Sequence, residues 1–260
     1  MRSIDPVSLN YLLVKKTRLT FPLDCVSFEE VKSKLSNKQI EKIMFDFGKY
    51  LGELHQLTGS GYGFIDASLL DNYELKGSHK TWYDFWKENF DTGFKEMKKI
   101  EIEEKKTRKY RTNLSNKNRI LMHELLDRKS EFLEIFEKNK KLINSSEPHF
   151  LNGNLYTKNI TLRKGKFVGL ADFQKSLLGD PVNELAYFSV MPEGNKYFPL
   201  MLKGWKTKVK VRDFEEKLHL YRLIESYRKI FTRYITHRYL DTYPEPLKIA
   251  QEELKYYNIK

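Results

Sequence analysis

The stretch from His149 to Ala186, HFLNGNLYTKNITLRKGKFVGLADFQKSLLGDPVNELA, decides the fold of this chain. Two short runs of β-forming residues flank the turn sequence RKGK at 163–166, a composition typical of a β-hairpin connection. With the turn centred there, we expect Asn159 to pair with Leu170 and Asp172 to follow at the same end. An amide oxygen and a carboxylate would then converge, as oxygen ligands of Mg²⁺ do beside bound phosphates.

A helix start follows the hairpin. Gly179-Asp180-Pro181 supplies a turn, with Asp180 as the helix cap and proline in the first turn. The apolar run at 185–191 then predicts a buried helix. The stretch as a whole is therefore a polar loop, a hairpin, a second polar turn and a capped helix.

This order of motifs resembles the catalytic core of the aminoglycoside phosphotransferase and choline kinase group, which shares the protein-kinase fold. The signature of that group reads approximately HGDLHxxN, then a strand pair, then IDFxxxxxGDPxxDLA. In this chain NGNLYTKN at 152–159 stands at the first motif, and ADF at 171–173 and GDPVNELA at 179–186 match the others.

The resemblance implies that Asn159 and Asp172 are the metal ligands and that Asn154 occupies the position of the catalytic aspartate. Asn152 stands in place of the first histidine of the motif, and we group it with Asn154 as a catalytic-position residue. An amide can orient an alcohol, but it cannot take the proton of that alcohol. General-base catalysis contributes about 10²–10⁴-fold, so the replacement predicts weak turnover or none.

The fold class we expect is α+β: the mainly helical large, C-terminal lobe of the protein-kinase-like fold with a small β-hairpin core. Residues 1–35 would form a remnant of the hinge strand, with a buried strand at 11–14, and residues 36–260 the lobe, with its catalytic loop and metal hairpin at 149–186. The first glycine is Gly48, so we expect no glycine-rich phosphate-covering loop before the hinge and a small lobe that is largely missing.

Ser36 or Asn37 is expected to cap a helix whose apolar residues recur at helical spacing. That helix ends near His55, which matches a histidine of the resembled family that holds local backbone. We therefore assign His55, like Asp180, a structural role.

Further helices are expected along the chain. The aromatic residues of 82–86 predict core packing, whereas the highly charged segment 94–119 predicts an exposed helix followed by a basic turn. Another helix should reach towards Asn144, and a long helix is expected over 214–235.

Composition narrows the function classes. The 260 residues carry a formal charge of +12, but the basic residues are spread widely and interleaved with glutamate, which favours a solvated surface over a nucleic-acid site. A single cysteine, Cys25, indicates a reducing compartment, and we expect a cytoplasmic protein. No apolar run approaches the ~20 residues that span a bilayer, so no membrane partner is expected.

Three hypotheses remain open. The first is a phosphotransferase-like protein that is weakly active or inactive as an isolated chain and uses its lobe to bind a ligand or partner. The second is an active small-molecule kinase that acts on a hydroxyl substrate with Mg²⁺ and ATP, and whose small lobe comes from a second chain or whose chemistry tolerates Asn154. The third, supported only by the scattered basic segments such as 105–111 and 203–212, is a nucleic-acid-binding module on a kinase-like scaffold.

Overall fold

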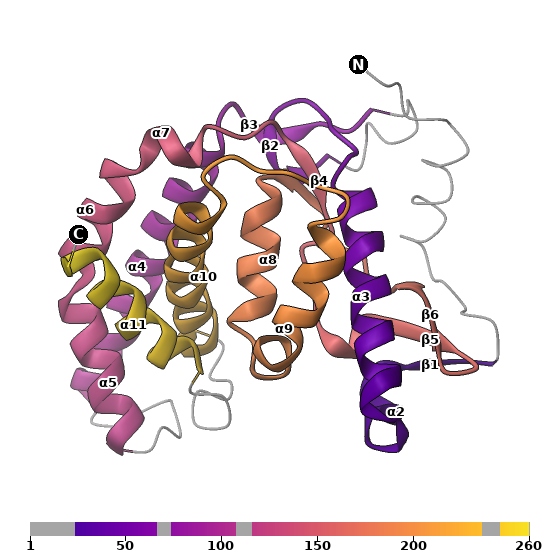
Figure 1. Cartoon of the computed structure of the whole chain (residues 1–260). Coiled ribbons are helices and arrows are strands. Elements are labelled where there is room, and N and C mark those ends of the chain that lie inside the picture. Colours follow the sequence, from indigo (N-terminus) through magenta and orange to yellow (C-terminus); the bar gives the residue numbers. More distant parts are fainter. Residues whose placement is uncertain (1–23, 67–73, 108–115, 236–244, 260) are drawn as a thin grey trace.

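The computed structural model describes residues 24–66, 74–107, 116–235 and 245–259, and Figure 1 shows their arrangement. The helices are α2 (Phe28–Val31), η1 (Lys32–Lys34), α3 (Asn37–Leu54), α4 (Trp82–Thr107), α5 (Asn116–Asp127), α6 (Lys129–Lys138), α7 (Lys140–Ile143), η3 (Thr157–Asn159), α8 (Pro181–Ser189), α9 (Pro192–Trp205), α10 (Phe214–Ile235) and α11 (Glu245–Ile259). The strands are β1 (Cys25–Ser27), β2 (Tyr62–Ile65), β3 (Gly77–His79), β4 (His149–Leu151), β5 (Ile160–Arg163), β6 (Lys166–Leu170) and β7 (Leu177–Gly179). This mainly helical α+β architecture confirms the expected fold class.

The strands form two small sheets. One has the order β1-β5-β6 and the other β3-β2-β7-β4, and neighbouring strands in both are antiparallel. The polar loop after β4 therefore connects the second sheet to the first. The segment between β6 and β7 crosses back, so both connections meet where the two sheets adjoin.

The predicted hairpin turn is confirmed. Arg163 pairs with Lys166, and the two residues between them, Lys164 and Gly165, have φ values of 49° and 72°. Positive φ at both central residues is the backbone twist that two-residue hairpins require, and glycine supplies one of them without steric cost.

The predicted pairing of Asn159 with Leu170 is wrong by one residue. A register shift between positions 161 and 162 places an extra residue in the second strand, so that Ile160 pairs with Leu170 instead. Asn159 lies one step further out, where its carbonyl accepts a hydrogen bond from the N–H of Ala171 at 2.8 Å. The bulge thus places Asn159 opposite Ala171, the residue before Asp172.

Helix α8 lies between α9 and α10 at the centre of the molecule (Figure 1), and all of its residues are buried. One side of it contributes Val182 and Ala186 to a core shared with α4, α6, α10 and α11. The other side contributes Leu185 and Phe188 to a core shared with α3, α9 and the hairpin. Because α8 is buried on all sides, both hydrophobic cores pack against it.

Helix α3 begins as predicted, with Ser36 as its N-cap and a capping box formed with Gln39. It packs closely on α9 through two glycines. A Cβ atom on Gly48 would lie 1.9 Å from the carbonyl oxygen of Met201, and one on Gly204 would lie 2.0 Å from that of Phe45. This close approach fixes the end of α3, where His55 is the C-cap.

Of the other helix predictions, one is confirmed and one is wrong. Helix α10 matches its predicted bounds, whereas the single helix expected to run towards Asn144 is three helices, α5 to α7. At the break between α6 and α7, both the side-chain amide and the backbone N–H of Asn139 donate to the carbonyl of Ile135, at 2.8 and 3.2 Å. The predicted strand 11–14 and most of the basic cluster 105–111 lie outside the described residues.

The charged segment that begins at Phe94 is helical to residue 107, as predicted, but it is not exposed all round. Phe94, Met97 and Ile100 turn one face of α4 into the core. Among the helices of the described ranges, none combines the length and the apolarity that crossing a membrane requires.

Candidate functional site

The polar loop between β4 and η3 is held close to the segment that follows the hairpin. Gly153 has a φ of 73°, and a Cβ atom there would lie 2.0 Å from the carbonyl oxygen of Lys175. Only glycine therefore allows this approach. The result is that Asn154, the next residue, faces Asp172.

Asn154 contacts both predicted metal ligands. Its side-chain Nδ2 donates to Asp172 Oδ2 at 2.5 Å, and its backbone carbonyl accepts from Asn159 Nδ2 at 2.8 Å. Asn154 and Asn159 are 8% and 6% exposed. The structure therefore brings three of the predicted site residues together, with the amide of Asn154 engaged by the carboxylate of Asp172.

Asn152 serves the same loop differently. Its Oδ1 accepts from the backbone N–H of Asn154 at 3.1 Å, and its Nδ2 donates to the backbone carbonyl of Asp172 at 3.3 Å. The side chain is fully buried. Asn152 is thus a positioning residue that ties the loop to the end of β6, and these hydrogen bonds orient both of its amide atoms.

Asp172 has a left-handed backbone conformation with a φ of 60°. Non-glycine residues held in such regions cost of the order of 1–3 kcal/mol and cluster at functional sites. The conformation ends β6 and turns the carboxylate towards the loop, where it meets Asn154.

Glu184, in the first turn of α8, holds the backbone of the loop at Asn152 and Gly153. The sequence alone predicted no role for it. It accepts hydrogen bonds from the backbone N–H groups of Asn152 and Gly153 at 3.0 and 2.6 Å, and it contacts His55 Nε2 at 2.9 Å. Glu184 is 2% exposed. The available signal was an acidic residue in the first turn of an otherwise apolar helix.

His55 is a neutral imidazole whose tautomer is set by its partners. The indole Nε1–H of Trp205 donates to His55 Nδ1 at 2.9 Å, so Nδ1 carries no proton. The proton is therefore on Nε2, which donates to Glu184. His55 therefore belongs to a buried framework, formed with Trp205 and Glu184, that holds the backbone of the loop at 152–153.

Asp180 joins α8 to α10. Its Oδ1 caps α8 by accepting from the N–H of Val182 at 2.9 Å, and its Oδ2 accepts from Lys217 Nζ at 2.7 Å and the hydroxyl of Tyr221 at 3.1 Å. The carboxylate is completely buried. The same carboxylate raises the pKa of Tyr221, although burial is the larger cause.

The side-chain oxygens of Asp172 and Asn159 suit a cation that is also coordinated by a phosphate. Asp172 offers a carboxylate and Asn159 an amide, both at the open end of the hairpin. Within the described ranges no group of three or more histidine, cysteine, aspartate or glutamate residues could hold a metal ion. Mg²⁺ fits such a site because it is usually bound by one or two carboxylates together with water and substrate phosphates.

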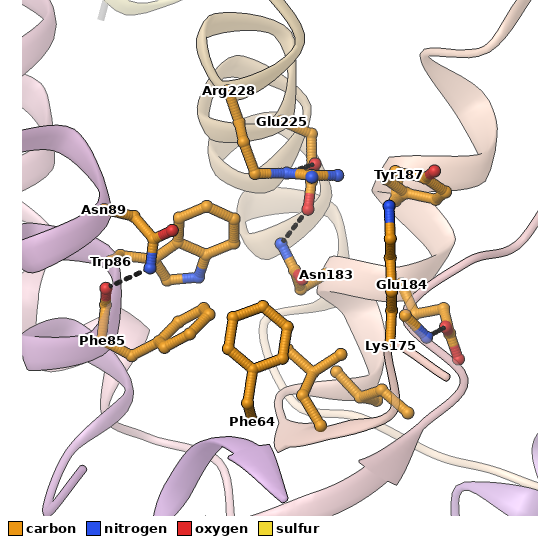
Figure 2. A pocket seen from close by; sticks show the side chains of 13 residues that line it. Phe64, Phe85, Trp86, Asn89, Lys175, Asn183, Glu184, Tyr187, Glu225 and Arg228 are labelled. Carbon is orange, nitrogen blue, oxygen red and sulfur yellow. Dashed lines mark hydrogen bonds and ion pairs between the residues drawn. The ribbon is translucent and has the colours of Figure 1, made fainter. Parts of the chain in front are cut away.

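A cavity of about 80 Å³ opens beside the loop, between β2, α4, α8 and α10. Gly153 lines it on the loop side and Arg228 on the α10 side (Figure 2). A wider cleft of about 460 Å³ lies next to it along α4 and α10, and shares Phe64, Phe85 and Arg228 with it.

Comparisons with solved structures agree with this fold. A thermostable mutant of aminoglycoside phosphotransferase APH(4)-Ia in its apo form matches with a TM-score of 0.58 and 13% identity, over 95% of this chain and 82% of that one. Its ternary complex with AMP-PNP and hygromycin B matches with a TM-score of 0.57 and 14% identity, over 95% and 81%. Another APH(4)-Ia structure gives 0.55 and 13%, over 88% and 68%.

These identities are too low to show more than the fold. The comparison with curated protein sequences gave no match. A family model described as the phosphotransferase enzyme family, APH, matches residues 22–214, which is well over half of the chain. The chain therefore belongs to the phosphotransferase enzyme family.

Proposed function

We propose that this chain binds a small hydroxyl compound as a phosphotransferase-family protein, and that its own phosphoryl transfer is weak or absent. The observation that carries the proposal is the amide of Asn154 at the position of the family's catalytic carboxylate, hydrogen-bonded to Asp172. An amide has no basic site for the alcohol proton. The family assignment and the adjoining cavity support a small-molecule ligand.

Asp172 and Asn159 would hold Mg²⁺ together with the phosphates of ATP. When bound, the ion neutralises charge that develops on the phosphoryl oxygens. In this chain Asn154 holds the Asp172 carboxylate and Asn152 holds the loop, so that the ligands are oriented before any ion arrives. Phosphoryl transfer depends mainly on such positioning, which is why a low residual rate is compatible with the proposal.

The test measures binding and transfer separately. Titration of the full chain with Mg²⁺-ATP, followed by melting temperature, should show weak stabilisation or none. Transfer from ATP to alcohols should stay near background in the natural chain and in Asn154→Asp, with Asn154→Ala as the control. Robust transfer by the natural chain would refute the proposal, whereas robust transfer by Asn154→Asp alone would refute the expectation that an essential small lobe is missing.

A second candidate is an active kinase completed by another chain. The convergence of Asn159 and Asp172 on Asn154 favours it, because both ligand positions keep oxygen-bearing side chains. A copurified complex that transfers phosphate and loses this activity with Asp172→Ala would establish it. Either activity belongs in the cytoplasm by our proposal, because the single Cys25 suits a reducing compartment.

A further inference from the structure

The cavity beside the loop has aromatic walls. Phe64 on β2 and Phe85 and Trp86 on α4 surround it, and the rings of Phe64 and Phe85 meet edge to face with centroids 5.6 Å apart. Phe64 is 54% exposed, so it forms the outer wall. A volume of about 80 Å³ is smaller than the cavity of about 150 Å³ that encloses a benzene ring, so a ring bound here would extend past Phe64 and Phe85 into the adjoining cleft of about 460 Å³.

Trp86 carries a hydrogen-bond donor that the protein does not use. Its side chain is 2% exposed, and its Nε1–H has no hydrogen-bond partner. In Figure 2 the indole nitrogen faces the space beside the rings of Phe85 and Phe64. Buried polar groups are nearly always paired, and an unpaired one calls for an explanation such as a ligand. An oxygen acceptor in the cavity would supply the missing partner.

The carboxylates that line this cavity already have partners. Glu184 holds the loop and His55. Glu225 pairs with Arg228 Nε at 2.6 Å and accepts from Asn183 Nδ2 at 3.1 Å (Figure 2). The lining also includes Lys175, which forms no ion pair with any residue in the described part of the chain. The cavity thus offers a ligand the hydrogen-bond donor of Trp86 and the positive charge of Lys175, whereas both of its carboxylates are already paired.

We propose that the ligand of this cavity is a small aromatic alcohol without positive charge, whose oxygen accepts a hydrogen bond from Trp86 Nε1. The ring lies against Phe64 and Phe85, and its outer end faces Gly153, the neighbour of Asn154. A polycationic aminosugar is excluded because its ammonium groups would meet Lys175 and Arg228 without a free carboxylate. The assignment rests on the proposed function, since it names the acceptor class of the same site.

Isothermal titration calorimetry without nucleotide tests the proposal directly. The probes are 2-(4-hydroxyphenyl)ethanol, the anion 4-hydroxyphenylacetate and the polycation hygromycin B. We expect the two aromatic probes to bind and hygromycin B not to bind. Failure of both aromatic probes to bind, or binding of hygromycin B alone, would overturn the assignment. Because no ATP is present, these outcomes are independent of whether the chain transfers phosphate.

Trp86→Phe keeps an aromatic ring and removes the donor. It should weaken aromatic binding roughly tenfold, the value of about one hydrogen bond to a buried group. The same variant should destabilise the chain less than Trp205→Phe, because both lose part of a buried ring but only Trp86→Phe also removes an unpaired buried donor. Phe64→Ala should weaken binding without unfolding, and Val168→Ala, an exposed site on β6, is the control. Unchanged affinity in Trp86→Phe would contradict the assigned contact.

Discussion

Two hydrogen-bonded groups hold the loop at 152–154, one through its backbone and the other through the side chain of Asn154. The two groups differ in whether their residues suit the chemistry of the family. The first group is a buried series of hydrogen bonds that runs from Trp205 through His55 to Glu184 and on to the backbone of the loop. The second group is Asn154 and Asp172, which a nucleotide and an alcohol would contact in the proposed function. The charges and hydrogen bonds of the first group are fully paired, whereas the second group has an amide, Asn154, where the proposed function would require a carboxylate.

The difference separates folding from chemistry. A backbone N–H that is buried without an acceptor costs free energy, so the residue that satisfies it is needed for the loop to fold. A general base has no such role in stability. A general base could therefore be replaced without loss of the loop, and we expect the two groups to respond differently to substitution.

The largest expected effect is that of Glu184→Ala. It would leave two backbone N–H groups and the Nε2–H of His55 without their buried acceptor, so we expect a loss of about 3 kcal/mol or more in the free energy of unfolding. Urea denaturation measures it. The control is Glu215→Ala on α10, whose side chain is 71% exposed and should change little. Equal small losses in both variants would contradict the role of Glu184.

Trp205→Phe should be the next largest. It removes the donor to His55 Nδ1 and part of a fully buried ring, for a loss of about 2 kcal/mol. Without that donor only Glu184 favours the Nε2–H tautomer of His55, so we expect a measurable fraction of the Nδ1–H form. Nitrogen-15 NMR of the imidazole measures the tautomer. An unchanged Nε2–H signal in Trp205→Phe would show that Glu184 alone sets the tautomer.

The sequence carried enough to predict the local features. The turn composition at 163–166 located the hairpin, Ser36 located the start of α3, and Asp180 located the start of α8. Each of these depends on contacts within a few residues. The predicted register of the hairpin was wrong by one position, because the alternation of the two short strands does not reveal the extra residue, Val168, between the pairs Thr161–Gly169 and Leu162–Phe167.

The role of Glu184 could not be predicted in this way. Its partners lie 31, 32 and 129 positions away, so nothing near it in the sequence marks them. The strands of the second sheet were also missed, since β3, β4 and β7 are only three residues long and too short to show alternation. The free Nε1–H of Trp86 likewise appears only when the packing around it is known.

Asn154→Asp should have a smaller effect on stability, and one that depends on the cation. It replaces a hydrogen bond to Asp172 with two neighbouring carboxylates, so we expect a loss of about 1–2 kcal/mol in chelator. Millimolar Mg²⁺ should recover much of it, because the ion neutralises the pair. Thermal melts with and without Mg²⁺ measure this. Asn154→Ala, which adds no charge, should show no recovery.

The smallest effect concerns pH. Burial lowers the pKa of His149 below its usual 6.5, even though its Nδ1 lies 2.6 Å from the carbonyl oxygen of His55 and nearby acidic groups oppose the shift. Below about pH 6.5 the unfolded chain therefore binds a proton more readily than the folded one, and stability falls as the pH is lowered.

His149→Gln removes this proton uptake. The dependence of the free energy of unfolding on pH should consequently be flatter in the variant between about pH 7 and 5, whatever its stability at neutral pH. Urea titrations at several pH values give both slopes. Since His149 begins β4 and contacts the backbone of His55, the effect belongs to the framework that holds the loop backbone and should be the same with and without Mg²⁺. A slope that changes with Mg²⁺ would show that the framework and the pair of Asn154 and Asp172 are coupled, against the separation argued from the two groups.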